Sequence, residues 1–136
     1  MNTVVKSIVE ACTRGSEDES LKFPQQLAKL AEAGVEGYYA DLRRSLRTYY
    51  LPNGEVIESP TAKLSGLISE SFDPVRVEAA VRQSQADEHT YQDFCRKITA
   101  AGCAGYLVSL LGRRVVYFGR TAETHVEHFP GAASRT

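Results

Sequence analysis

The stretch AGVEGYYADL, residues 33–42, recurs as AGCAGYLVSL at residues 101–110, at a constant offset of 68 positions. Over the first six positions of the two copies, Ala, Gly, Gly and Tyr are identical. The first glycine of each copy follows a segment with helical apolar spacing, and glycine commonly ends a helix in the left-handed conformation. The residues that follow it alternate with a period of two, which is typical of a strand. The stretch therefore predicts, twice, a helix that ends at glycine and leads into a strand.

The match extends outward from this stretch. Phe23 aligns with Tyr91 and Leu30 with Ile98, and after a one-residue gap Tyr50-Leu51 aligns with Tyr117-Phe118. We therefore predict two halves, at about 22–58 and 90–129, each a helix followed by an antiparallel three-stranded meander. Because halves of about 65 residues are marginal alone, we expect one pseudo-symmetric α+β domain over residues 1–130, with a flexible tail at 131–136. A crevice between the halves is the expected ligand site.

Local signals supply the remaining elements. Apolar residues at helical spacing predict a first helix that ends near Gly15, and Pro24 suits the first turn of a second helix over 24–33. Asp73-Pro74 and Thr90 are helix-starting signals for two further helices, the second of which ends at Gly102. Strands are predicted at 35–43, 46–51, 55–58, 103–111, 114–120 and 124–129, with a connection at 59–72 that holds at most one helical turn.

Composition narrows the class of protein. The 136 residues include 16 basic and 17 acidic side chains, a formal net charge of −1, which argues against a dedicated nucleic-acid binder. No apolar run predicts a signal peptide or a membrane-spanning helix, so membrane insertion is not expected. The cysteines Cys12, Cys95 and Cys103 are odd in number and contain no CxxC pair, which favours buried thiols in the cytoplasm. No cofactor is predicted.

A family resemblance covers nearly the whole chain, from the first helix to Pro130. The block AAGCAGYLVSLLGRRVVYFGRTAETHVEHFP at 100–130, together with AGVEGYYADL and TYYLPNGE, resembles the YbcV-like family of small bacterial and prophage proteins. Members of that family are often labelled phage envelope protein. The resemblance implies a duplicated α+β domain of unknown function, and it brings no catalytic motif to this chain.

Tyrosine is concentrated on the predicted strands, which carry six of the seven tyrosines of a chain without tryptophan. Buried strand tyrosines supply core bulk with a satisfied hydroxyl, whereas exposed ones favour a binding surface. Both interpretations remain open at this point. The candidate binding residues are strand tyrosines and polar residues that we expect at the crevice between the halves: Tyr38, Asp41, Tyr50, Tyr106, Tyr117, Arg120, His125 and Glu127.

A second candidate site lies on the last predicted strand, where Glu123, His125 and Glu127 alternate and therefore share one face. An imidazole between carboxylates can bind a divalent metal ion or perform acid/base chemistry. The pattern matches neither HExxH nor HxxEH, and the HxE deaminase motif lacks its PCxxC partner. An ordinary exposed strand histidine is the alternative interpretation. Nucleotide binding through a Gly-rich loop is excluded, because both Gly-x-x-Gly segments lead into strands.

The leading hypothesis is a small cytoplasmic binding or protein-interaction module that is not an enzyme, of prophage origin if the resemblance holds. Its ligand, a protein or a small molecule, is unknown, and an exposed aromatic patch on it would support a homodimer. The alternative is a small enzyme or metal-binding protein that uses the strand face of Glu123, His125 and Glu127. Exposed strand tyrosines favour the first hypothesis, and convergence of the three polar residues favours the second.

Overall fold

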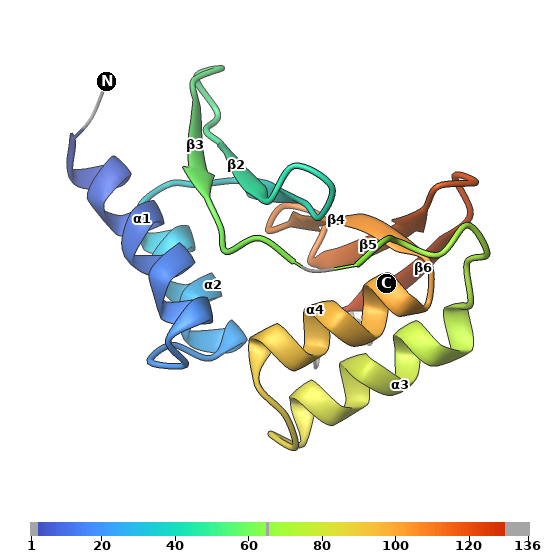
Figure 1. Ribbon diagram of the computed structural model, residues 1–136. Helices are drawn as coiled ribbons and strands as arrows, with labels where there is room; N and C mark the ends of the chain where they lie inside the picture. Colours follow the sequence, from blue (N-terminus) through green and yellow to red (C-terminus); the bar gives the residue numbers. More distant parts are fainter. Residues whose placement is uncertain (1–2, 65, 130–136) are drawn as a thin grey trace.

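The computed structural model describes residues 3–64 and 66–129, and the predicted tail lies outside them. Over these residues the chain forms four helices and six strands (Figure 1). In chain order they are α1 (Thr3–Glu17), α2 (Phe23–Glu32), β1 (Gly37–Asp41), β2 (Leu46–Tyr50), β3 (Val56–Pro60), α3 (Pro74–Gln85), α4 (Tyr91–Ala100), β4 (Cys103–Ser109), β5 (Arg114–Gly119) and β6 (Thr124–His128).

All six strands form one antiparallel sheet with the order β3-β2-β1-β4-β5-β6. The predicted α+β class is confirmed, and so is a three-stranded meander in each half of the chain. The halves join through β1 and β4, where Tyr38 lies opposite Val108. The halves therefore meet edge to edge within a continuous sheet, and the crevice between them as a ligand site stays a prediction. Their descent from a duplication stays a prediction.

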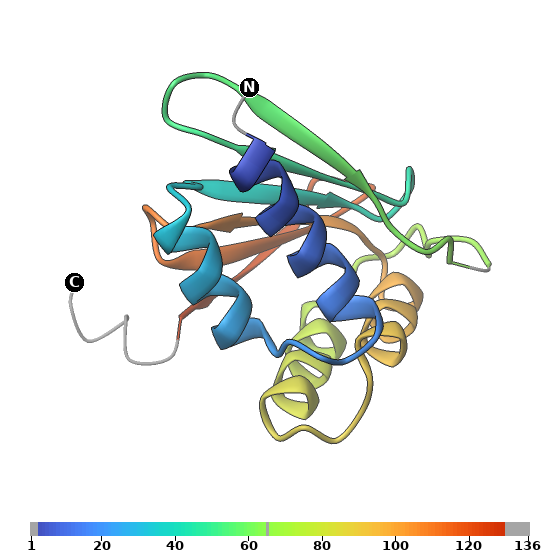
Figure 2. The same ribbon diagram turned by 90° about the vertical axis from the view of Figure 1, so that its left-hand side faces the viewer.

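The helices cover one face of this sheet (Figures 1 and 2). Helices α1 and α2 lie over the β1–β3 half, and α3 and α4 lie over the β4–β6 half. The exposure of the strand residues alternates accordingly: Tyr38 and Val108 are buried beneath the helices, whereas Leu107 and Val126 are 40% and 42% exposed on the other face. The sheet is thus one wall of the core and also an open surface.

Strand register places the inward side chains in two rows that cross all six strands. Because residues paired across antiparallel strands point to the same face, the register defines both rows directly. The first row runs His125, Tyr117, Tyr106, Ala40, Arg47 and Ser59, and the second runs Glu127, Val115, Val108, Tyr38, Tyr49 and Ile57. The positions on β5, β4 and β1 in the middle of each row are apolar or aromatic. Basic or acidic residues occur in the rows only at Arg47 on β2 and at His125 and Glu127 on β6.

The helix ends follow the predicted signals. The Asp73 carboxylate accepts hydrogen bonds from two backbone N–H groups in the first turn of α3, and Thr90 begins α4 with a capping box. Gly102 ends α4 at φ 92°, in the left-handed region that favours glycine. The prediction that α1 ends near Gly15 is wrong by two residues, because this glycine lies inside the helix, which ends at Glu17. The described residues between β3 and α3 contain no helical turn.

Candidate functional site

A buried arginine lies at the centre of the space between β2, α1 and α2. Arg47 points inward from β2 and is only 1% exposed. Its Nη2 donates to Ser16 Oγ at 2.9 Å, and its Nη1 donates to Tyr49 Oη at 3.2 Å and to Gln26 Oε1 at 3.4 Å. All three acceptors are neutral, so the hydrogen bonds hold the guanidinium without neutralising its charge.

Tyrosine rings enclose the same guanidinium. The Arg47 Cζ lies 5.0 Å from the ring centroid of Tyr38 and 5.2 Å from that of Tyr91, both within the range of a cation–π interaction. The hydroxyls of Tyr91 and Tyr106 are 2.7 Å apart and hydrogen-bond to each other. Three aromatic side chains from β1, α4 and β4 therefore surround one cation.

No described residue supplies Arg47 with a negative charge. None of the ion pairs formed within residues 3–64 and 66–129 includes it, and its Nε is buried without a hydrogen-bond partner. The neighbouring tyrosines do not act as anions, because burial raises the pKa of Tyr38, Tyr91 and Tyr106 above the usual value. A buried charge without a counter-charge costs several kcal/mol. Arg47 is therefore an unpaired cation in the protein interior.

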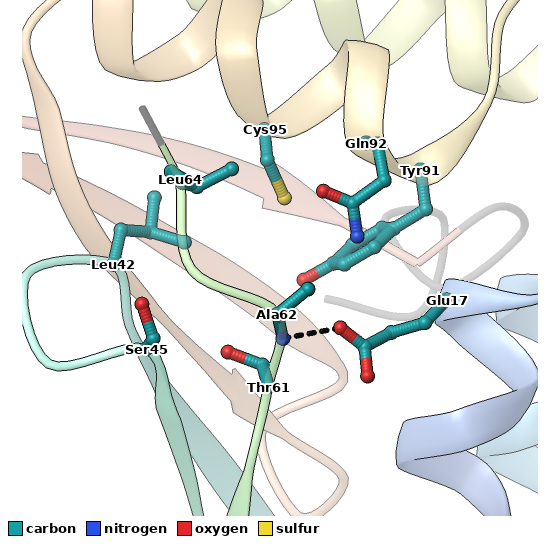
Figure 3. Close-up of a pocket in the computed structure, with 9 residues that line it drawn as sticks. All are labelled: Glu17, Leu42, Ser45, Thr61, Ala62, Leu64, Tyr91, Gln92 and Cys95. Atoms are coloured by element: carbon teal, nitrogen blue, oxygen red, sulfur yellow. Dashed lines mark hydrogen bonds between the residues drawn. The ribbon is translucent and has the colours of Figure 1, made fainter. Parts of the chain in front are cut away.

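Tyr91, which belongs to this cluster, also lines a small pocket (Figure 3). Glu17 from the end of α1 accepts a hydrogen bond from the backbone N–H of Ala62 at its rim, and the Tyr91 ring and the Cys95 thiol face into it. The pocket has room for about one water molecule. Tyr91 thus contacts both the buried guanidinium and this pocket.

A second polar cluster lies where α3 packs against β6, at the other end of the inward rows. His125 Nε2 is 2.6 Å from Glu127 Oε2, and Arg82 Nη1 is 2.9 Å from Glu127 Oε1. Glu78, one turn before Arg82 on α3, has an oxygen 3.9 Å from the Arg82 guanidinium. The ligand atoms of Glu78, His125 and Glu127 all lie within 4.8 Å of one another. The Arg82 guanidinium is therefore the cation shared by the carboxylates of Glu78 and Glu127, and the His125 imidazole lies beside them.

The structure divides the predicted site residues among these places. Tyr38 and Tyr106 belong to the Arg47 cluster, and Tyr117 lies between it and His125, with its ring centroid 5.4 Å from that of Tyr106 and 6.4 Å from that of His125. All three tyrosines are at most 6% exposed, which is contrary to a role on an open binding surface. His125 and Glu127 come together on β6 as predicted.

The other predicted residues lie elsewhere. The Asp41 carboxylate accepts from the backbone N–H groups of the β1–β2 turn, and Arg120 donates to the Ile68 carbonyl oxygen. Tyr50 is half-buried and points to the open face of the sheet. Glu123 lies in the turn before β6, where Thr121 Oγ1 donates to its carboxylate. The expectation that Glu123 shares the β6 site is therefore wrong.

Comparison with known proteins places the chain in a family. The sequence profile of a family described as "Protein of unknown function (DUF1398)" matches residues 13–127, which include both polar clusters. The chain belongs to the DUF1398 family. Because the match runs from α1 to β6, the described fold is the fold of a DUF1398 protein, and the family description assigns it no activity.

The names of the curated relatives give no function. "Uncharacterized protein Mb2035" of Mycobacterium bovis and "Uncharacterized protein Rv2012" of Mycobacterium tuberculosis are each 28% identical over 108 residues, 79% of this chain. The chain spans just under two thirds, 66%, of the length of these relatives. Their names give neither a YbcV-like nor a prophage label, so that resemblance stays a prediction. None of the described helices is long and apolar enough to cross a membrane.

Sequence reasoning missed two central residues of this DUF1398 protein, Arg47 and Glu78. The signal for Arg47 was present, because strand alternation puts position 47 on the same face as Tyr49. An arginine between inward positions of a strand is unusual enough to mark it. Glu78 carried no such signal, since a glutamate on a helix is ordinary and only the packing of α3 against β6 brings it to His125.

Proposed function

We propose that this protein is a binding protein for a small molecule that carries an oxyanion, a carboxylate or a phosphate, and that Arg47 is the anion receptor. The observation that carries the proposal is the fully buried guanidinium with neutral partners only and an unpaired Nε. Proteins rarely bury a charge without a partner, and those that do have a use for it. A ligand oxyanion is the partner that the interior lacks.

The donors around Arg47 suit an oxyanion. A guanidinium has five N–H groups, and three of them donate to Ser16, Tyr49 and Gln26. The remaining Nε–H and one Nη2–H are of the kind that binds carboxylate or phosphate oxygens. Hydroxyls that burial keeps protonated, such as those of Tyr91 and Tyr106, are further donors. The guanidinium thus offers donors to a negative group, and no carboxylate among the described residues forms an ion pair with it.

Tyr91 is the proposed point of entry. Its ring lies against the Arg47 guanidinium, with the Cζ 5.2 Å from the ring centroid, and it also lines the pocket. The pocket itself has room for about one water molecule, so the anion reaches Arg47 only when Tyr91 moves aside. This places an upper limit on the buried part of the ligand, which is a single carboxylate or phosphate group.

We also propose a cytoplasmic location and a homodimer. A cytoplasmic location is supported by the three buried free thiols, Cys12, Cys95 and Cys103. Homodimer formation is supported by the open face of the sheet, which carries exposed Val56, Leu107 and Val126 together with half-buried aromatic residues. The proposed location and the proposed dimer are independent of the anion site, because that site lies beneath the helices.

The test uses ligand-induced stabilisation. The melting temperature of the wild type is measured in chloride and, at equal ionic strength, in inorganic phosphate or acetate. Arg47→Met is the test variant, and Arg44→Met, which removes an exposed arginine three residues away, is the control. A ligand at 100 times its Kd stabilises the folded state by about 2.7 kcal/mol. We expect phosphate, acetate or both to raise the melting temperature of the wild type and Arg44→Met but not that of Arg47→Met. Equal responses of all three proteins, or no response of the wild type, contradict the proposal.

A further inference from the structure

The polar cluster between α3 and β6 has the composition of a metal site. Glu78 comes from α3, His125 and Glu127 come from β6, and their ligand atoms lie within 4.8 Å of one another. Glu127 is only 9% exposed, and the His125 side chain is 17% exposed. Two of the three donors are therefore held in fixed positions, unlike the carboxylates of an ordinary solvated surface.

We propose that Glu78, His125 and Glu127 bind a divalent transition-metal ion such as Zn²⁺, and that Arg82 is displaced when the ion binds. One imidazole nitrogen and two carboxylate oxygens are donors that Zn²⁺ and its neighbours accept, with remaining positions open to water. Mg²⁺ and Ca²⁺ prefer sites made of oxygen alone. The imidazole therefore selects the transition-metal class.

In the structure, the Arg82 guanidinium lies where the proposed metal ion would bind. It binds Glu127 through both Nη atoms, at 2.9 and 3.4 Å, and it lies 3.9 Å from Glu78. Its side chain is 53% exposed, so it is able to turn into solvent without unpacking the core. The exchange replaces one cation by another, which means that the nearly buried Glu127 carboxylate keeps a positive partner throughout.

Binding requires two local adjustments. Donors about 2.1 Å from one ion are at most about 4.2 Å apart, so the 4.8 Å cluster must contract, and Glu78, with its side chain 49% exposed, is the residue free to rotate. His125 Nε2 lies 2.6 Å from Glu127 Oε2, and a metal ion coordinates only a ring nitrogen that carries no proton. Coordination through Nε2 therefore replaces the contact with Glu127 and requires the tautomer that is protonated on Nδ1.

The site is distinct from the Arg47 cluster. His125 and Arg47 stand in the same inward row, but β5, β4 and β1 separate their strands. The proposal does not rest on the proposed function, and either one is able to fail alone.

The experiment titrates the full-length protein with Co²⁺ and follows the visible absorption of the bound ion, with Zn²⁺ added afterwards as a competitor. Bands typical of nitrogen and oxygen ligands are expected, whereas intense near-ultraviolet charge-transfer bands would place the ion on a cysteine and overturn the proposal. Glu78→Gln is the test variant, and Glu123→Gln, the same change at another exposed glutamate nearby, is the matched control. Circular dichroism verifies that each variant is folded.

We expect Glu78→Gln to weaken Co²⁺ binding by about tenfold or more and Glu123→Gln to leave it unchanged. Arg82→Gln is expected to strengthen binding about fivefold, because it removes the competing cation. Absence of Co²⁺ binding by the wild type at millimolar concentration, or equal affinities of Glu78→Gln and Glu123→Gln, overturns the site. Weaker binding by Arg82→Gln overturns the displacement of Arg82.

Discussion

Replacing Arg47 by methionine should make the protein more stable. Methionine has a similar length and no charge, so it fills the space between α1, α2 and β2 without the cost of burying a guanidinium. That cost is several kcal/mol for each ion even after relaxation, and no described carboxylate offsets it at Arg47. Apolar replacement of buried charged groups elsewhere has been neutral or stabilising by about 1–4 kcal/mol.

The neighbours of Arg47 determine where in that range the change falls. Tyr49 keeps a hydrogen bond to Thr13 at 3.0 Å, and the Ser16 hydroxyl keeps its bond to the Cys12 carbonyl oxygen. The Gln26 side-chain nitrogen keeps the Leu21 carbonyl, so only its Oε1 loses a partner, at a cost of about 1–3 kcal/mol. The two cation–π contacts are also lost, and the net range of about 1–4 kcal/mol already includes the loss of such favourable contacts. We therefore expect a net gain toward the lower end, about 1–2 kcal/mol.

Urea denaturation followed by circular dichroism measures this gain directly. Arg47→Met should raise the free energy of unfolding and leave the slope with urea unchanged, which corresponds to a rise of roughly 3–8 °C in the melting temperature. Arg44→Met should lie within about 0.5 kcal/mol of the wild type, because Arg44 is exposed. A loss of more than about 1 kcal/mol on Arg47→Met would refute the reasoning, since the guanidinium would then be a net stabilising group that awaits no partner.

Three other predictions follow from the described contacts. Gly102→Ala should lower the free energy of unfolding, measured by urea denaturation, by several kcal/mol, and Gly34→Ala should lower it by only about 1–2 kcal/mol. Both glycines have a positive φ, but a Cβ at Gly102 would overlap a backbone carbonyl of a neighbouring loop, whereas a Cβ at Gly34 would meet nothing within 4 Å. Burial raises the pKa of Cys95 to about 11 and that of Cys103 to about 12, because the folded protein favours the neutral thiols. Their contribution to stability is therefore complete below the unfolded thiol pKa near 9, and it is lost as the pH rises from 9 toward 12. Unfolding curves from pH 7 to 11 should show this loss, and it should shrink in the Cys95→Ala/Cys103→Ala variant. Asp73→Ala should lower the free energy of unfolding by about 1 kcal/mol, because the carboxylate accepts two N–H groups at the start of α3, whereas Asp73→Asn should lower it by less.

Local patterns predicted the elements well, because each depends on neighbours in sequence. The period-two runs and the caps at Asp73 and Thr90 fall where the structure has strands and helix ends. The predicted end of the first helix near Gly15 is two residues short of the observed end at Glu17. Gly15 lies inside the helix and faces Leu21, which follows the helix. Packing there overrides the usual preference of glycine for a helix end.

Pairing between the halves and the choice of the covered face lay beyond such patterns. Tyr38 and Tyr39 are both aromatic, so alternation alone does not say which one faces the helices, although the structure buries only Tyr38. The pairing of β1 with β4 joins residues 37–41 to residues 105–109 and depends on no local signal. The same limit applies to the candidate site. Strand spacing predicted His125 and Glu127 correctly, but it added Glu123, whereas the third residue of the cluster is Glu78 of α3.

The two clusters occupy the only places where the inward rows break the rule that buried strand positions are apolar or neutral. At their other positions the rows hold alanine, valine, isoleucine, serine and tyrosine, which are residues that proteins often bury on a helix-covered sheet face. Arg47 on one side and the His125 and Glu127 pair on the other lower stability relative to apolar residues, because each charge must be desolvated. Their imbalance is opposite in sign, a cation without a counter-charge at Arg47 and two carboxylates against one arginine at β6. Departures of this kind from the folding pattern concentrate at functional sites, and the opposite signs explain why we assign an anion to one cluster and a cation to the other.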